Sequence, residues 1–134
     1  MGERMTVRSL GGHRVEATNG VHGITLDLPQ ALGGAGTALG AHEALLAALG
    51  SCTVMTLEVY ATRKGIPLEG VELSLGREPA PVGEPTGRER ITVELKLLGP
   101  LDGAQKSRLL EIAQKCPVYK TLTGHPEVVE RLVT

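Results

Sequence analysis

Aromatic side chains are nearly absent from this chain of 134 residues, which contains two Tyr and neither Phe nor Trp. Any core must therefore be built from aliphatic side chains, and hydrophobic residues do make up 41% of the sequence, as in a globular domain. Proteins that bind single-stranded nucleic acid use exposed aromatic rings on which the bases stack. The shortage of aromatic residues argues against such a surface.

The sequence also lacks an excess of positive charge, because 14 Lys and Arg oppose 15 Asp and Glu. A nucleic-acid backbone is bound by clustered cations, so we expect no nucleic acid among the partners. The first 20 residues carry several charges and no apolar stretch of a secretory signal, and we find no run of 18 apolar residues. We therefore expect a cytoplasmic protein with no membrane contact.

Alternating polar and apolar residues predict three strands in the first part of the chain, near residues 5–10, 14–18 and 22–28. We expect turns at Gly11-Gly12 and at Asn19-Gly20, because Asn-Gly is the strongest signal for a two-residue hairpin of type I′. In the third strand the alternation places Ile24, Leu26 and Leu28 on a buried face, and Thr25 and Asp27 on a wet face.

A Gly- and Ala-rich loop over residues 29–40 leads into a long apolar helix, which the spacing predicts over residues 41–64. Both faces of its first half are apolar, so we expect neighbours on more than one side. Two strands near residues 70–77 and 89–98 then form a hairpin with a long Pro- and Gly-rich tip.

Asp102 is expected to cap a further helix that runs to about residue 115, where the proline after Cys116 ends it. A short helix over residues 117–123 and a last strand near residues 127–133 complete the predicted order βββαββααβ. This order predicts an α+β fold with mainly antiparallel pairing, in a single domain over residues 1–134.

Cysteine is scarce, with only Cys52 and Cys116 present. In a reducing compartment they are expected to be redox-active, catalytic or buried. Pro117 is favoured at the first position of a helix, so the sulfur of Cys116 should lie near amide groups that stabilise a thiolate; alternatively, Cys116 is a small buried hydrophobe. Cys52 lies within an apolar helix, where burial favours the inert thiol.

Two cysteines are the minimum for a cycle in which one thiolate attacks a peroxide and a second thiol traps the resulting sulfenic acid. A metal site is disfavoured, because the sequence has no CxxC or HExxH motif and its four His are scattered singly. We therefore expect no bound metal.

Three segments around the two cysteines resemble the OsmC/Ohr family of osmotically inducible and organic hydroperoxide resistance proteins: HEALLAALGSCTVMTL, RKGIPLEGVEL and KCPVYKTLTGHPEV. The LGGAG sequence before the long helix and the GG turn near the start of the chain are similar to the Ohr branch. The resemblance extends from about Leu10 to Val133, which is nearly the whole chain.

This resemblance implies an OsmC-like intertwined homodimer, in which antiparallel sheets wrap around the long central helices and two active sites lie at the subunit interface. It implies a peroxidatic cysteine at Cys52 and a resolving cysteine at Cys116, with no flavin, haem or metal. The family's glutamate at the start of the central helix corresponds to Glu43. The nearest match to its activating arginine is Arg14, one residue from the Ohr placement.

The favoured function is a thiol-dependent peroxidase of the oxidative stress response, which reduces organic hydroperoxides with electrons from a small or protein-bound dithiol. The alternative is a diverged OsmC-like protein that binds a small apolar ligand or senses oxidants without efficient turnover. Glu43 and Cys52 are nine residues apart and face opposite sides of a regular helix. Glu43 could thus orient Arg14 toward the partner's Cys52, or it could only complement the helix dipole.

Overall fold

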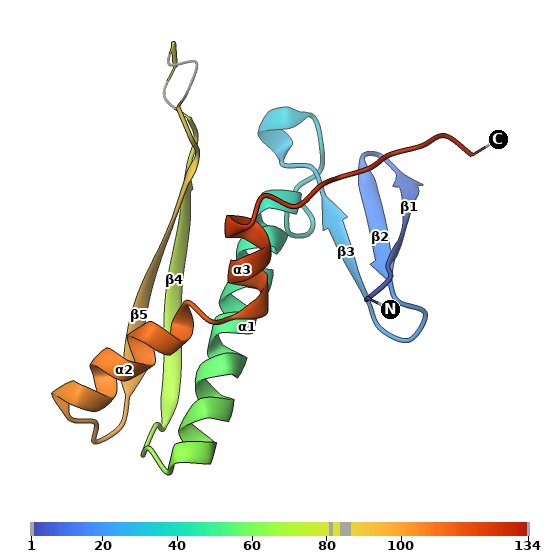
Figure 1. Ribbon diagram of the computed structural model, residues 1–134. Coiled ribbons are helices and arrows are strands. Elements are labelled where there is room, and N and C mark those ends of the chain that lie inside the picture. Colours follow the sequence, from blue (N-terminus) through green and yellow to red (C-terminus); the bar gives the residue numbers. More distant parts are fainter. Residues whose placement is uncertain (1, 81, 84–86, 134) are drawn as a thin grey trace. The chain divides into compact units, whose positions relative to one another are not determined.

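The computed structural model describes residues 2–80, 82–83 and 87–133 and contains both strands and helices (Figure 1). The elements follow in the order β1 (Thr6–Gly11), β2 (Arg14–Thr18), β3 (Gly23–Asp27), the 3₁₀ helix η1 (Gln30–Leu32), α1 (Ala41–Lys64), β4 (Gly70–Glu78), β5 (Arg90–Leu98), α2 (Gly103–Ala113) and α3 (Pro117–Thr123). This architecture confirms the α+β class. The bounds of these strands and α-helices agree with the sequence prediction to within about two residues.

Two compact units make up the chain, Met1–Ala47 and Ala48–Thr134. The first contains the antiparallel sheet β1-β2-β3. Its first hairpin turns at Gly12 and His13, whose φ angles of 62° and 68° are both positive, as a type I′ turn requires. This turn therefore lies one residue later than the Gly-Gly pair suggested.

The second hairpin differs from the prediction, because Thr18 pairs with Gly23 and a four-residue loop separates them. The side chain of Asn19 stabilises this wider loop: its Oδ1 accepts hydrogen bonds from the N–H groups of Val21 at 2.9 Å and His22 at 2.8 Å. An Asx turn of this kind competes with the two-residue turn that Asn-Gly usually forms.

The prediction for the faces of β3 was wrong at two positions. Asp27 is only 4% exposed, whereas Ile24 is 53% exposed. The reason is that the segment after β3 folds back along it: the Asp27 N–H donates to the Leu39 carbonyl at 3.0 Å. The Thr37 N–H and hydroxyl donate to Asp27 Oδ2 at 2.9 and 2.6 Å, and the hydrogen bond from the hydroxyl contributes most to holding the pKa of Asp27 below its ordinary value.

The second unit is built on the hairpin of β4 and β5, whose antiparallel register runs from Gly70 opposite Leu98 to Glu78 opposite Arg90. The long tip was predicted at this place, and residues 81 and 84–86 of it lie outside the described residues. The helix α1 approaches the sheet so closely at Gly50 that an added Cβ would lie 2.9 Å from a methyl group of Leu75.

Packing of α2 against α1 forms the buried core of this unit, with Leu57, Leu109, Ile112 and Ala113 at its centre. Leu57 and Leu109 are fully buried, and side chains of both strands pack against the cluster. Asp102 caps α2 as predicted, because its side chain accepts a hydrogen bond from the Gln105 N–H at 2.7 Å in a complete capping box.

The predicted last strand over residues 127–133 is wrong. This segment has no regular secondary structure, and no backbone hydrogen bond pairs it with another described segment. A strand exists only where another strand pairs with it. Its apolar residues Val128, Val129, Leu132 and Val133 are between 70% and 96% exposed, so the alternating sequence is present without its pairing partner.

One expectation about hydrophobic runs also needs correction. By length and composition, α1 is a helix that could cross a membrane, although polar residues interrupt its apolar sequence. Core helices of soluble proteins meet the same criteria, and a single helix of this kind is weak evidence for a membrane span.

Neighbouring leucines of α2 provide a test of this packing, since Leu109 is fully buried and Leu110 is 55% exposed. We expect Leu109→Ala to lower the free energy of unfolding by about 3 kcal/mol, because it leaves a cavity in the core. The matched Leu110→Ala variant should lose less than about 1 kcal/mol. Urea unfolding followed by circular dichroism measures both values, and equal losses would contradict the packing described here.

Candidate active site

The fold brings the two cysteines together within the second unit. Cys52 lies in the middle of α1 and is partly exposed, whereas Cys116 is fully buried. The two thiols lie close enough for each to shift the pKa of the other. Residues 64 positions apart in sequence thus form a pair of adjacent sulfur atoms.

Local sequence explains the position of Cys116. It is the N-cap residue of α3, with Pro117 at the first helical position, and its Sγ accepts a hydrogen bond from the Tyr119 N–H at 3.4 Å. The predicted placement near a helix N-terminus is therefore confirmed. Cys116 is also buried. It is therefore both a sulfur at a helix N-terminus and a small buried residue.

Burial raises the pKa of Cys52, and the hydrogen bond with Cys116 raises it further. The Val118 N–H and the Thr56 hydroxyl also hydrogen-bond with the Cys52 sulfur and lower its pKa, but these effects are smaller. A hydrogen bond that Cys52 donates stabilises its protonated form. Cys52 therefore retains its proton in preference to its neighbour.

Burial also raises the pKa of Cys116, but here hydrogen bonds outweigh it and the pKa is lower than usual. The largest of these effects comes from Cys52, followed by the Tyr119 N–H, the Thr53 hydroxyl and the Val118 N–H. The same Thr53 hydroxyl also donates a hydrogen bond to the Leu49 carbonyl oxygen at 3.0 Å. Negative charge in this pair is therefore best stabilised on Cys116.

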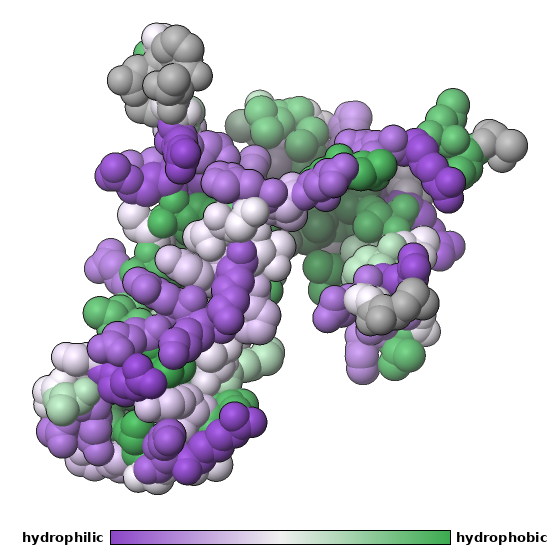
Figure 2. Space-filling view, in the orientation of Figure 1, coloured by the Kyte–Doolittle hydropathy of each residue, from purple (hydrophilic) through white to green (hydrophobic). Residues whose placement is uncertain are grey.

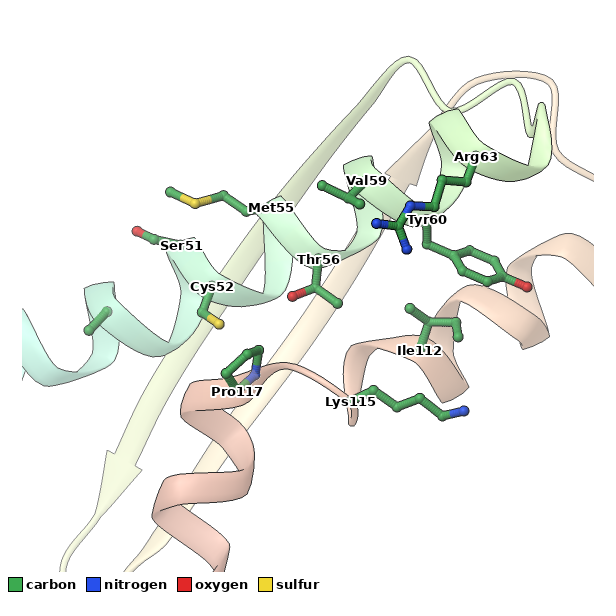
Figure 3. Close-up of a pocket in the computed structure, with 11 residues that line it drawn as sticks. Ser51, Cys52, Met55, Thr56, Val59, Tyr60, Arg63, Ile112, Lys115 and Pro117 are labelled. Carbon is green, nitrogen blue, oxygen red and sulfur yellow. The ribbon is translucent and has the colours of Figure 1, made fainter. Parts of the chain in front are cut away.

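A cavity of about 590 Å³ opens beside Cys52 (Figure 3). Its walls are mainly apolar side chains of α1, together with Ile112 and Pro117. Cys52 lines this cavity and Cys116 does not. A ligand in the cavity would therefore meet the sulfur of Cys52 first.

Sequence reasoning missed several polar residues of the cavity wall, namely Tyr60, Arg63 and Lys115. The Tyr60 hydroxyl accepts a hydrogen bond from Arg108 Nε at 3.0 Å, and the Arg108 guanidinium carbon lies 5.6 Å from the ring centroid. Arg63 could have been found from the sequence, because it follows Cys52 by eleven residues and residues at this spacing fall on nearly the same face of a helix.

Arg14 and Glu43, which the resemblance implied as site residues, both belong to the first unit. Glu43 lies in the first turn of α1, and its Oε1 accepts a hydrogen bond from the Gly40 N–H at 2.9 Å. Arg14 is exposed at the start of β2, and it forms no ion pair with any described residue. The structure thus gives Glu43 a local capping role and does not join it to Arg14.

No group of three or more His, Cys, Asp or Glu residues is arranged to hold a metal ion in the part of the chain that the structure describes. The site's own side chains offer two neighbouring thiols, of which Cys116 is buried and Cys52 faces an apolar cavity.

Comparison with protein families matches residues 34–131 to the family described as OsmC-like protein. The chain belongs to the OsmC-like family. No curated protein matched the sequence.

Solved structures of this family share the fold of the chain. An OsmC-like protein from Mycoplasma pneumoniae superimposes with a TM-score of 0.77 at 21% identity, covering 93% of this chain and 89% of its own. The organic hydroperoxide resistance protein OsmC of Legionella pneumophila gives 0.65 at 24% identity, with 90% of each chain covered. An organic hydroperoxide resistance protein of Bacillus subtilis gives 0.62 at 22%, with 93% of each chain covered.

Two threonines of α1 test the assignment of charge within the cysteine pair. Thr53→Val removes a hydroxyl that stabilises the Cys116 thiolate, so we expect the pKa of Cys116 to rise and its thiolate to appear at higher pH. Thiolate absorbance in the ultraviolet, followed during a pH titration of the reduced protein, measures this change.

The matched control is Thr56→Val, which removes a hydroxyl bonded to Cys52 instead. The Thr56→Val variant should raise the pKa of Cys52. It should not change the pH of the first ionisation, which belongs to Cys116. If Thr56→Val and not Thr53→Val shifts the first ionisation, the thiolate resides on Cys52.

Proposed function

We propose that this chain is a thiol-dependent peroxidase that reduces organic hydroperoxides through a two-cysteine cycle. The observation that carries the proposal is the pair of neighbouring thiols, of which one faces an apolar cavity and the other is buried. Membership of the OsmC-like family supports it, and relatives of the same fold are described as organic hydroperoxide resistance proteins.

Accessibility assigns the attack to Cys52, even though charge is better stabilised on Cys116. A substrate in the cavity reaches Cys52 and cannot reach the fully buried Cys116. In the proposed step the Cys52 thiol transfers its proton to the Cys116 thiolate as its sulfur attacks the terminal peroxide oxygen. The O–O bond breaks, the alkoxide takes a proton from water and leaves as the alcohol, and Cys52 becomes a sulfenic acid.

The second step forms a disulfide. The Cys116 sulfur attacks the sulfenic sulfur of Cys52, and the hydroxyl group takes the proton of the Cys116 thiol and leaves as water. A dithiol then reduces the disulfide by thiol exchange, so that the net reaction converts one hydroperoxide and one dithiol into an alcohol, water and an oxidised dithiol. Because Cys116 is adjacent to Cys52, trapping competes with further oxidation to the sulfinic acid.

Arg14 and Glu43 belong to the proposal as the residues that the family resemblance implies. A guanidinium near Cys52 would favour its charged form and would reverse the preference for charge on Cys116. The hydrogen bond from the Gly40 N–H to Glu43 favours a capping role for Glu43. Arg14 has no ion-pair partner among the described residues, and its side chain is therefore available for another contact.

The alternative function, ligand binding or oxidant sensing without efficient turnover, is favoured by the same apolar cavity. Under either function we expect the protein in the cytoplasm, where thiols are kept reduced.

Hydroperoxide consumption by the reduced protein with an excess of dithiothreitol tests the proposal. We expect faster turnover of cumene hydroperoxide than of hydrogen peroxide, because the cavity is apolar. Cys52→Ser should lose turnover by at least about a hundredfold, since the attacking sulfur is absent.

Cys116→Ser is the matched variant for this experiment. It should still oxidise once and then accumulate sulfinic acid on Cys52, which intact-mass analysis detects, whereas the wild-type protein should lose two hydrogens as a disulfide forms. Stoichiometric disulfide formation without turnover would favour the oxidant-sensing alternative, and an inert Cys52 would contradict both functions.

We also propose a homodimer, because a single chain leaves much apolar surface uncovered. Among the described residues of the first unit, Ala17 is the only buried hydrophobic residue. On α1, Met55 and Val59 are 62% and 51% exposed, and apolar side chains reach the surface in Figure 2. Three strands without a hydrophobic core are not stable alone, so a second chain is the expected cover.

Sedimentation measures the oligomeric state directly. We expect a dimer that persists at micromolar concentration, with an interface well above about 2,000 Å², and dilution should release unfolded rather than folded monomer. A compact species of 14.1 kDa at these concentrations would contradict the proposal.

A further inference from the structure

Asp27, the last residue of β3, binds the segment that leads from β3 to α1 (Figure 1). Its N–H donates a hydrogen bond to the Leu39 carbonyl at 3.0 Å. Its Oδ2 accepts hydrogen bonds from the N–H and the hydroxyl of Thr37 at 2.9 and 2.6 Å. The main chain and the side chain of Asp27 therefore both fix residues 37–39 at the end of β3.

The carboxylate that makes these bonds is shielded from water, since Asp27 is only 4% exposed. Its other oxygen, Oδ1, is buried and has no hydrogen-bond partner in the described part of the chain. A buried acceptor without a donor lowers stability, whereas a charged acceptor strengthens the hydrogen bonds that it does receive. The charge of Asp27 thus serves to hold Thr37 firmly rather than to stabilise the fold at least cost.

Glu43 is held by the residue that follows this fixed segment. The Gly40 N–H donates to Glu43 Oε1 at 2.9 Å, and Gly40 directly follows Leu39, whose carbonyl accepts from Asp27. Gly40 is buried, and an added Cβ would lie 3.4 Å from Glu43 Oε1 and 3.9 Å from the Asp27 carbonyl oxygen. Asp27, Gly40 and Glu43 thus form one chain of contacts within the first unit.

We propose that Asp27 is a positioning residue, which sets the place of the Glu43 carboxylate at the start of α1. Loss of its bonds to Thr37 frees residues 37–39 from β3, the Gly40 N–H moves with them, and Glu43 loses its hydrogen bond. Asp27 acts through Glu43 and takes no part in the chemistry itself. This inference rests on the proposed peroxidase function, in which Glu43 is an implied site residue, and adds the residue that holds Glu43 in place.

Amide hydrogen exchange at Gly40 tests this placement without any peroxide chemistry. Asp27→Asn removes the charge of the acceptor, and Thr37→Val removes the hydroxyl donor. We expect each variant to speed exchange of the Gly40 amide by about tenfold, because a hydrogen bond to a charged group is weakened or lost. Unchanged exchange at Gly40 in both variants would overturn the proposal.

Thr25→Val is the matched control, because Thr25 is an exposed threonine of the same strand. It should leave the exchange of the Gly40 amide as it is in the wild-type protein. Amides of the β1-β2 ladder show whether each variant is folded. If Asp27→Asn does not fold, Thr37→Val still gives the test, since it keeps the Thr37 N–H and the carboxylate.

Turnover supplies a double-mutant cycle. We expect Thr37→Val to slow the turnover of cumene hydroperoxide by about tenfold, since a small displacement of a site residue is costly. It should cause no further slowing in a Glu43→Gln background, and Thr25→Val should keep the wild-type rate. Equal slowing in both backgrounds, or slowing in neither, would refute the positioning role.

The two measurements separate this inference from the proposed function. No turnover of any hydroperoxide by the wild-type protein would refute the peroxidase, and exchange at Gly40 would still decide whether Asp27 places Glu43. Rapid turnover together with unchanged exchange at Gly40 in Asp27→Asn and Thr37→Val would support the peroxidase and refute the role of Asp27.

Discussion

The packing of α2 against α1 is the constraint on which the site depends. Leu57 and Leu109, both fully buried, hold the two helices together over the sheet. The helix α2 ends at Ala113 within the same cluster. The core therefore fixes the start of the turn that follows, and this turn places Cys116 beside Cys52. The apolar cavity has the same origin, since Ile112 belongs to this cluster and also lines the cavity wall.

Two demands on a reactive thiol are divided between two residues in this arrangement. A nucleophile must be reached by its target, which burial prevents, and it must lose its proton, which an apolar wall opposes. Cys52 meets the first demand and Cys116 the second. In the proposed cycle the proton of Cys52 passes to the neighbouring Cys116, so the pair together meets both demands.

Patterns confined to a few neighbouring residues were sufficient to predict most of the fold. The Asp102 cap, the proline after Cys116 and the alternation in β5 are local, and the structure confirms each of them. The failures depend on distant partners: Asp27 is buried because a later loop folds onto it, and residues 127–133 alternate correctly without a strand to pair with. Arg63 and Lys115 line one cavity only through tertiary packing, which helical spacing alone does not specify.

The sulfur of Cys116 has two structural roles, because it caps the N-terminus of α3 and also takes part in the thiol pair. A charged acceptor binds an amide hydrogen more strongly than a neutral one, so the first turn of α3 is most firmly anchored while the sulfur carries charge. In the proposed cycle, conversion of that sulfur to a disulfide would remove the charge and weaken the anchor. Oxidation would then increase fraying of α3, and faster exchange of the Tyr119 amide hydrogen with solvent would report it.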